Sequence, residues 1–290
     1  MVRKMPGLLN RATMNNEHLE TLLSGVGDMS LKRRIKVVLE GLELKDSDIL
    51  LDCGCGDGLY YYFLSSFSSC QYYGLDLNFE NIKINQANSN FLHAKFYHGN
   101  ILSLPYKDGT FDKIISSETV EHVDDDLQAL KELYRVLKKG GTMLLTVPNH
   151  NYPFLWDPIN RFLETIAHGF HFKSGFLAGL WNQHVRLYYP DEIMKVVENA
   201  GFIVEGVQLV THYCLPFNHY LINAVAIILS KNKLPINIAR SLNRTTSREN
   251  ERPFLIEAAF KFAGWVDRLN DRLGTDGKSS VCIAIKARKC

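Results

Sequence analysis

Residues 50–58 read Leu50-Leu51-Asp52-Cys53-Gly54-Cys55-Gly56-Asp57-Gly58 and carry the strongest structural signal in the chain. The segment begins as a buried strand, continues as a turn with glycine at every second position, and opens into a helix. Glycine has no Cβ, so the backbone of such a turn can approach a ligand closely. The helix that follows offers unpaired N–H donors in its first turn. We therefore expect a cofactor-binding loop at the carboxyl end of this strand.

Short apolar runs alternate with helical patterns from about residue 48 to residue 150, which is typical of parallel βαβ units. A helix is expected from about Asp124, ending where the lysine pair at 138–139 is followed by Gly140 and Gly141. A second helix is expected from Pro190 to Asn199. The expected strands are Ile49–Cys53, Tyr72–Leu77, Lys95–His98, Phe111–Ser116, Thr142–Val147, Val204–Val210 and Val281–Lys286.

The pattern predicts a single domain over residues 1–290. N-terminal helices occupy residues 1–45, and a cofactor-binding core occupies residues 46–150. An insertion rich in aromatic residues is expected to form a lid, and a second, helical insertion interrupts the sheet further along the chain. These parts are the lid insertion at 151–189, the closing helix and strands at 190–213 and 278–290, and the helical insertion at 214–277.

Composition and charge exclude several classes of protein. The 290 residues are 46% hydrophobic and 22% charged, which describes a folded globular chain. Thirty-three Lys+Arg against 31 Asp+Glu give a net charge of +2, so the chain lacks the basic excess of a DNA-binding protein. The six cysteines form no CxxC pair, and residues 1–10 contain no apolar run of signal-peptide length. These features favour a cytoplasmic protein with reduced thiols.

Further polar residues follow the next strands at the same expected edge of the sheet. Asp76 comes 18 residues after Gly58, at a strand end where a carboxylate can accept both hydrogen bonds of a ribose diol. Asn100 can offer its amide to an adenine edge while Ile101 packs on the ring. The dinucleotide fingerprint GxGxxG is not met, because Leu59 occupies the position of its third glycine. This argues against a nicotinamide-dependent oxidoreductase.

Together these residues resemble the class I S-adenosylmethionine-dependent methyltransferases, in particular the type 11 subgroup. The matching motifs are DxGCGxG at residues 52–58, GDxxxLP near residues 99–105 with Asn100 in place of Asp, FDxI at residues 111–114 and EHV at residues 121–123. The resemblance implies a Rossmann-like α/β fold: seven strands, mostly parallel with the last antiparallel, and helices on both faces. It also implies S-adenosylmethionine as cofactor, with the contacting residues Asp52, Gly54, Cys55, Gly56, Gly58, Asp76, Leu77, Asn100, Ile101, Ser117 and Glu118.

A narrower resemblance connects Glu118-Thr119-Val120-Glu121-His122 with the O-methyltransferases of ubiquinone biosynthesis, which carry ExxEH at this place. It implies a divalent cation held by Glu118, Glu121 and His122. On a helical turn these positions share a face, and their donor atoms suit Zn²⁺ or Mn²⁺ better than Mg²⁺. The alternative is that the motif forms one wall of the cofactor site in an enzyme that uses no metal.

The resemblance implies a methyltransferase that acts on a small acceptor. The aromatic insertions indicate that the acceptor is hydrophobic or lipid-like, with oxygen as the expected acceptor atom. His122 and His184 are the candidate bases, and structural histidines are the alternative. The apolar segment Tyr220–Leu229 is expected to form a buried helix, with an interfacial helix that contacts lipid as the alternative. The amphipathic helix from Phe254 is a further candidate for peripheral membrane contact. The alternatives are an RNA or protein methyltransferase, for which residues 240–252 carry four arginines, and a non-catalytic cofactor-binding scaffold. The sequence assigns no oligomeric state.

Overall fold

The computed structural model describes residues 16–217 apart from residues 25, 27, 92 and 168, together with residues 220, 262, 264–271 and 279–290. Its centre is a seven-stranded sheet in the order β3-β2-β1-β4-β5-β7-β6. Only β7 runs antiparallel to its neighbours β5 and β6. The strands are β1 (Ile49–Cys53), β2 (Gln71–Asp76), β3 (Ala94–His98), β4 (Phe111–Ser117), β5 (Leu137–Pro148), β6 (Ile203–Val210) and β7 (Cys282–Arg288). The predicted Rossmann-like α/β fold is confirmed.

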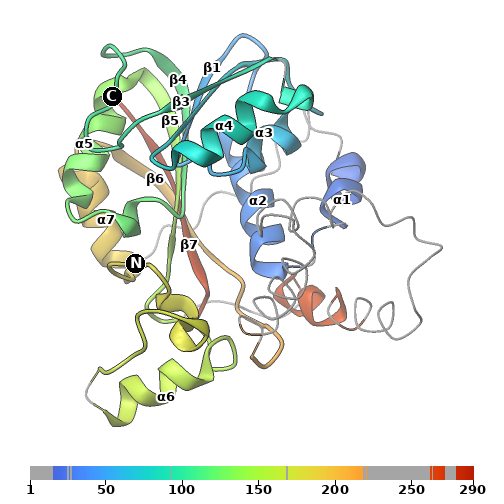
Figure 1. Ribbon diagram of the computed structural model, residues 1–290, viewed down its shortest axis with the longest axis vertical. Helices are drawn as coiled ribbons and strands as arrows, with labels where there is room; N and C mark the ends of the chain where they lie inside the picture. Colours follow the sequence, from blue (N-terminus) through green and yellow to red (C-terminus); the bar gives the residue numbers. More distant parts are fainter. Residues whose placement is uncertain are drawn as a thin grey trace.

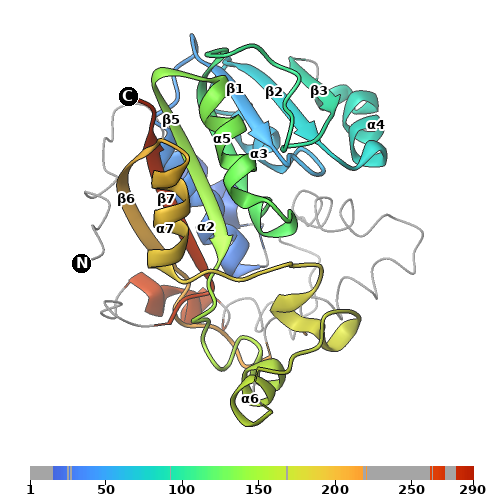
Figure 2. The same cartoon turned by 90° about the vertical axis from the view of Figure 1, so that its left-hand side faces the viewer.

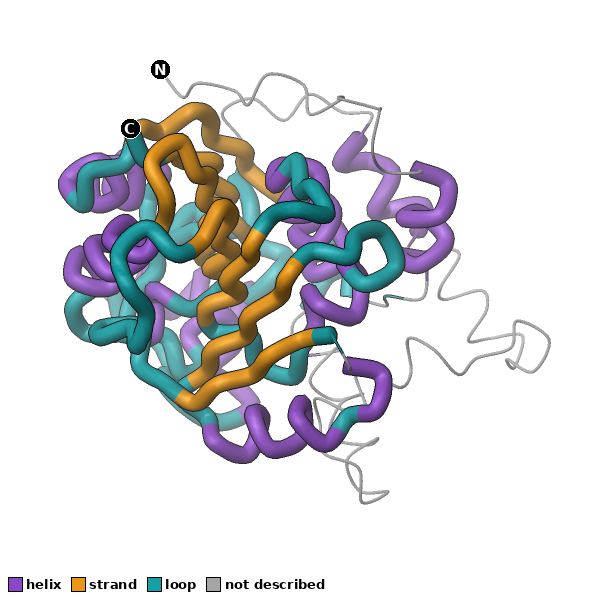
Figure 3. The backbone as a smooth tube through the Cα atoms, turned by 90° about the horizontal axis from the view of Figure 1, so that it is seen from above, coloured by secondary structure: helices purple, strands orange, loops and turns teal. Residues whose placement is uncertain are grey.

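Helices cover both faces of the sheet (Figures 1 and 3). One face carries α5 and α7, whose buried side chains, such as Leu133 and Ile193, join the strands in the largest core cluster. The opposite face carries α1 to α4, with Leu39, Phe63 and Ile82 in a second cluster. The helices are α1 (Asn16–Ser24), α2 (Met29–Leu42), α3 (Leu59–Leu64), α4 (Phe79–Ala87), α5 (Asp126–Val136), α6 (Pro158–Ile166) and α7 (Pro190–Asn199), with 3-10 helices η1 (Ser89–Phe91), η2 (Val120–His122) and η3 (Phe176–Trp181).

The strand order places a topological switch point between β1 and β4. The chain proceeds from β1 outward to β2 and β3, then returns to add β4 and β5 on the other side of β1. Ligands of open α/β sheets bind at such points, beside the carboxyl ends of the strands. The insertion that contains α6 lies at this end of β5 (Figure 2). The fold therefore brings the glycine loop, the end of β4 and the insertion to one end of the sheet.

The expected strands are all present, with ends that differ by one or two residues, except at the start of β5. The expected helix end at Gly140 is wrong, because α5 ends at Val136 and residues 137–141 already belong to β5. Leu137 pairs with Phe111 and is fully buried, and the Lys138 ammonium binds both oxygens of Asp112 at 2.7 and 2.8 Å. Burial of Leu137 and this ion pair stabilise an extended chain where the sequence resembles a helix C-terminus.

The insertion at residues 151–189 has a small core of its own. Tyr152, Trp156 and Trp181 are buried there together with Met29 of α2 and Val281 beside β7. Asp157 is fully buried and accepts hydrogen bonds from the Leu180 N–H at 3.0 Å and from the Asn160 side chain at 2.9 Å. These contacts tie α6 to η3 and to the end of the sheet.

Most of the helical insertion at residues 214–277 lies outside the described residues. This applies to most of the apolar segment Tyr220–Leu229, to most of the helix expected from Phe254, and to the arginines of residues 240–252. Within the part of the chain that the structure describes, no helix is both long and apolar enough to cross a membrane.

Candidate active site

The glycine loop after β1 is bound to the end of β2 by backbone hydrogen bonds. The N–H groups of Gly54 and Cys55 both donate to the Leu75 carbonyl, at 2.7 and 3.0 Å. The Gly56 N–H donates to Oδ2 of Asp76 at 2.8 Å. Two sequence-predicted cofactor segments, separated by about 20 residues, therefore form one hydrogen-bonded unit.

Gly54 and Gly56 in the loop have a left-handed backbone for different reasons. Gly54 has φ +82°, and a Cβ there would lie 2.1 Å from Oγ1 of Thr119. Gly56 has φ +50°, and a Cβ there would meet nothing within 4 Å. Gly54 is therefore required by packing of the loop against the segment after β4. Gly56 borders open space at the edge where a ligand is expected.

Asp52 lies just below the loop, in the sheet itself. Its side chain is almost fully buried, and the Tyr72 hydroxyl donates a hydrogen bond to Oδ2, while Oδ1 has no hydrogen-bond partner. Burial raises the pKa of Asp52 to about 7, against the lowering effect of the Tyr72 hydrogen bond. The sequence does not indicate this pairing, because it depends on the register that sets Asp52 beside Gly74 of the neighbouring strand.

The residues expected to hold the nucleoside lie at the ends of β2 and β3. Oδ1 of Asp76 accepts the Asn78 N–H at 2.7 Å, so both carboxylate oxygens orient the turn after β2. Leu77 is 65% exposed, whereas Ile101 is buried. Oδ1 of Asn100 accepts the Leu102 N–H at 2.9 Å.

The end of β4 supplies Ser117 and Glu118. The Tyr60 hydroxyl donates to Oγ of Ser117 at 2.8 Å, and that oxygen lies 2.8 Å from Oγ1 of Thr146. Glu118 has φ +51°, an uncommon conformation for a residue with a Cβ. Its Oε2 lies 3.1 Å from Nη1 of Arg34.

Sequence reasoning missed the contribution of Arg34. This residue belongs to α2 and lies far from Glu118 in the sequence, but both side chains are 20% exposed and form an ion pair. One feature of the sequence indicates that Arg34 faces the protein interior. Arg34 occurs at the spacing of the apolar helix face that includes Leu31 and Val38. A charged residue at that spacing indicates a buried partner.

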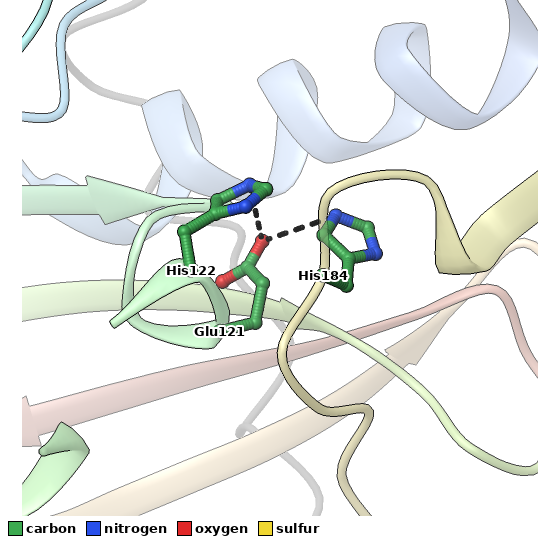
Figure 4. Close-up of side chains that lie close together, drawn as sticks. All are labelled: Glu121, His122 and His184. Carbon is green, nitrogen blue, oxygen red and sulfur yellow. Dashed lines mark ion pairs between the residues drawn. The ribbon is translucent and has the colours of Figure 1, made fainter. Parts of the chain in front are cut away.

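A second group of polar side chains lies just after β4. Glu121, His122 and His184 each offer one ligand atom, and these atoms lie within 4.8 Å of one another. Oε1 of Glu121 is 3.8 Å from Nε2 of His122 and 3.8 Å from Nε2 of His184 (Figure 4). The structure thus brings together the two histidines proposed as bases, and the carboxylate of Glu121 lies between them. Glu118 is not among these three residues.

Backbone contacts hold the two segments of this cluster together. The Val185 N–H donates to the Glu121 carbonyl at 3.0 Å. Nδ1 of His122 lies 2.8 Å from the Gln183 carbonyl, and Nδ1 of His184 lies 2.5 Å from the Leu180 carbonyl. Because a carbonyl oxygen only accepts, each Nδ1 carries a proton, and Nε2 has the lone pair in the neutral ring.

The carboxylate of Glu121 is unusual. It is fully buried, and neither oxygen has a hydrogen-bond partner among the residues that the structure describes. Burial, reinforced by the negative charge of Glu118, raises the pKa of Glu121 well above its usual value. The side chains of His184 and His122 are 13% and 36% exposed, so the cluster is reached from the His122 side.

Comparisons with known proteins point to methyltransferases. Residues 51–145 match the family model described as a methyltransferase domain. The chain is 33% identical over 128 residues to an uncharacterized protein from Methanocaldococcus jannaschii, covering 44% of this chain and 53% of that protein. It is 26% identical over 189 residues to a demethylmenaquinone methyltransferase from Anoxybacillus flavithermus, covering 60% of this chain and 79% of that enzyme.

Solved structures support the fold. An S-adenosylmethionine-dependent methyltransferase from Methanosarcina mazei is similar with a TM-score of 0.51 at 16% identity, covering 87% of this chain and 96% of that one. The chain spans about half the length of several curated relatives that it matches. The match to the family model is confined to residues 51–145, which contain the glycine loop and the strands around it.

Proposed function

We propose that the chain is a class I S-adenosylmethionine-dependent methyltransferase and that it transfers the methyl group of that cofactor to a small apolar acceptor, at oxygen. The observation that carries the proposal is the unit formed by Gly54, Gly56 and Asp76. It joins a loop with exposed backbone to a carboxylate at the switch point of the sheet, where nucleoside ligands bind in such folds.

In this proposal the loop lines the methionine part of the cofactor, and the carboxylate of Asp76 binds the ribose. Each Asp76 oxygen accepts one backbone N–H and keeps a further lone pair for a hydroxyl of the diol. Ile101 packs beside the adenine, and Ser117 and Glu118 border the reactive sulfonium. The ion pair with Arg34 helps to hold Glu118 in its left-handed conformation.

The acceptor is activated by the cluster after β4. A sulfonium methyl is already electrophilic, so the protein must align the acceptor and remove its proton. In the neutral tautomer set by their carbonyl contacts, His122 and His184 each direct a basic Nε2 toward the same point. Hydroxyl acceptors need such a base, which supports oxygen as the acceptor atom.

An apolar acceptor is supported by the insertion and by a relative. Large apolar side chains of the insertion are exposed at the end of the sheet, among them Phe154, Phe162, Phe170 and Phe176. The relative from Anoxybacillus flavithermus is named for a quinone substrate. In this proposal the insertion acts as a lid over an acceptor of comparable character.

The test is transfer of a labelled methyl group from S-adenosylmethionine to a panel of catechols, hydroquinones and sterols, with tRNA and a peptide mixture as separate arms. We expect transfer to an apolar hydroxyl compound, loss of transfer in Asp76→Ala, and normal transfer in Asp191→Ala, an exposed acid on α7. Transfer only to tRNA or peptide would overturn the proposed acceptor class. Binding of the cofactor without transfer to any arm would favour the scaffold alternative.

A further inference from the structure

The cluster of Glu121, His122 and His184 contains a fully buried carboxylate. Neither of its oxygens has a hydrogen-bond partner among the described residues, and such burial costs free energy unless a charge or a donor compensates it. Each imidazole lies 3.8 Å from Oε1, which is too long for a hydrogen bond, so the histidines compensate the carboxylate only as ion pairs when they are protonated. A cation at the point where the three side chains converge would compensate the buried negative charge of Glu121.

We propose that Glu121, His122 and His184 bind a divalent transition-metal ion, with Zn²⁺ as the best fit. Two imidazoles and one carboxylate are the ligand set of one class of catalytic zinc sites, in which three protein ligands leave a further position open. Mg²⁺ prefers oxygen ligands and would be a poor match for two nitrogen donors. The proposal that these residues bind a metal ion is independent of the proposed function. Any role of the ion in methyl transfer rests on the proposed function.

The distances are close to those that such an ion requires. Ligands about 2.0–2.1 Å from a tetrahedral ion lie about 3.3 Å from one another. The observed separations are 3.8 Å for each histidine to Oε1 of Glu121, and 4.8 Å is the upper limit for the set. The two separations from Glu121 must shorten by about half an ångström, and the separation of the histidine nitrogens by up to about 1.5 Å. His122, whose side chain is 36% exposed, has room for that movement.

The surroundings of both histidines are those of metal ligands. In metal sites the ring nitrogen that does not bind the ion donates its proton to a carbonyl or carboxylate, which fixes the tautomer and the ring orientation. Here Nδ1 of His122 contacts the Gln183 carbonyl, and Nδ1 of His184 contacts the Leu180 carbonyl. Both Nε2 atoms are thereby directed at Glu121.

This ligand set differs from the contiguous ExxEH set expected from the sequence. Oε2 of Glu118 is engaged by Arg34 at 3.1 Å, and its Oε1 accepts from Oγ1 of Thr146 at 3.3 Å. His184 supplies the third ligand instead. With the ion bound, both Nε2 lone pairs are occupied, so the ion would polarise the acceptor oxygen in place of a histidine base.

The test uses the full chain, stripped with a chelator and titrated with Zn²⁺ by calorimetry, and with Co²⁺ as a spectroscopic probe of ligand geometry. We expect one ion per chain, and at least tenfold weaker Zn²⁺ binding with loss of the Co²⁺ d–d bands in Glu121→Gln, His122→Ala and His184→Ala. His171→Ala changes a histidine of the same insertion that is not in the cluster and is expected to bind normally. Glu118→Gln is also expected to bind normally.

Three results would overturn the proposal. The first is a wild-type chain that binds neither ion, and the second is an affinity that survives in all three ligand variants. The third is loss of binding in Glu118→Gln with normal binding in His184→Ala, which would favour the ligand set Glu118, Glu121 and His122. Circular dichroism identifies any variant that fails to fold. The test of metal binding then relies on the ligand variants that do fold. Binding of S-adenosylhomocysteine, measured on the same samples, separates failure of the metal site from failure of the proposed function.

Discussion

The glycine loop and the Glu121–His122–His184 cluster follow neighbouring strands, but they are built in opposite ways. The loop comes from one short segment, and the N–H groups of Gly54, Cys55 and Gly56 all have acceptors within the protein. The cluster joins segments about 60 residues apart around a buried carboxylate whose oxygens accept no hydrogen bond from the described residues. The backbone of the loop is thus satisfied by the fold, whereas the carboxylate of the cluster is not satisfied by the part of the chain that the structure describes. Changes at the packed part of the loop should therefore cost stability, and changes in the cluster should cost function.

The largest effect is expected at Gly54. A Cβ there would collide with Thr119 and would also force a residue other than glycine to keep φ at +82°. We predict that Gly54→Ala lowers the free energy of unfolding by about 3 kcal/mol. Gly140→Ala is the matched control, because Gly140 has φ +79° but no atom within 4 Å of its added Cβ. It should lose only about 1 kcal/mol from backbone strain. Equal losses, measured by urea denaturation, would mean that the contact with Thr119 is unimportant.

An intermediate effect is expected at Asp52, just below the loop. Its folded-state pKa of about 7 lies above the value near 4 of an unfolded aspartate, so the folded protein favours the protonated form. Stability from this group is therefore present below about pH 4 and is lost as the pH rises to about 7. Asp52→Asn cannot titrate and should reduce the part of this decline between about pH 5.5 and about pH 7 by on the order of 2 kcal/mol. An unchanged dependence of the unfolding free energy on pH would contradict the burial of this charge.

The smallest effect, of opposite sign, is expected in the cluster. In metal-free protein, Glu121→Gln replaces a buried acid by an amide whose N–H groups can donate to the histidine Nε2 atoms. We predict that stability rises by about 1 kcal/mol, since residues kept for function commonly cost stability. A clear loss of stability in thermal or urea unfolding would show that Glu121 has a structural role instead.

The same contrast explains what the sequence could predict. Residues 50–58 and Asp76 could be identified because each lies at a strand end whose position follows from the local pattern of apolar residues. Parallel strand ends meet at one edge of a sheet, so their proximity follows from the fold class. The end of α5 was mispredicted because local signals at Lys138 and Gly140 favour helix termination, whereas burial of Leu137 favours a strand.

The sequence could not predict the composition of the cluster. Glu118, Glu121 and His122 lie within five consecutive residues, and a helical turn would place them on one face. The structure instead has a left-handed residue at Glu118 and a short 3-10 helix over Val120–His122. His184 reaches the cluster through the Val185 N–H bond to the Glu121 carbonyl, a contact for which no local pattern exists. The ion pair of Arg34 with Glu118 is non-local in the same way.

Calorimetric titration with S-adenosylhomocysteine tests the central claim most directly. The wild-type chain should bind at micromolar concentration, and Gly56→Ala, whose added Cβ extends into open space beside the loop, should bind at least tenfold more weakly while remaining folded. NAD⁺ serves as the control ligand and should give no heat of binding. A wild-type chain that does not bind S-adenosylhomocysteine, or a Gly56→Ala variant that binds it as tightly as wild type, would contradict the account of the loop as the cofactor site.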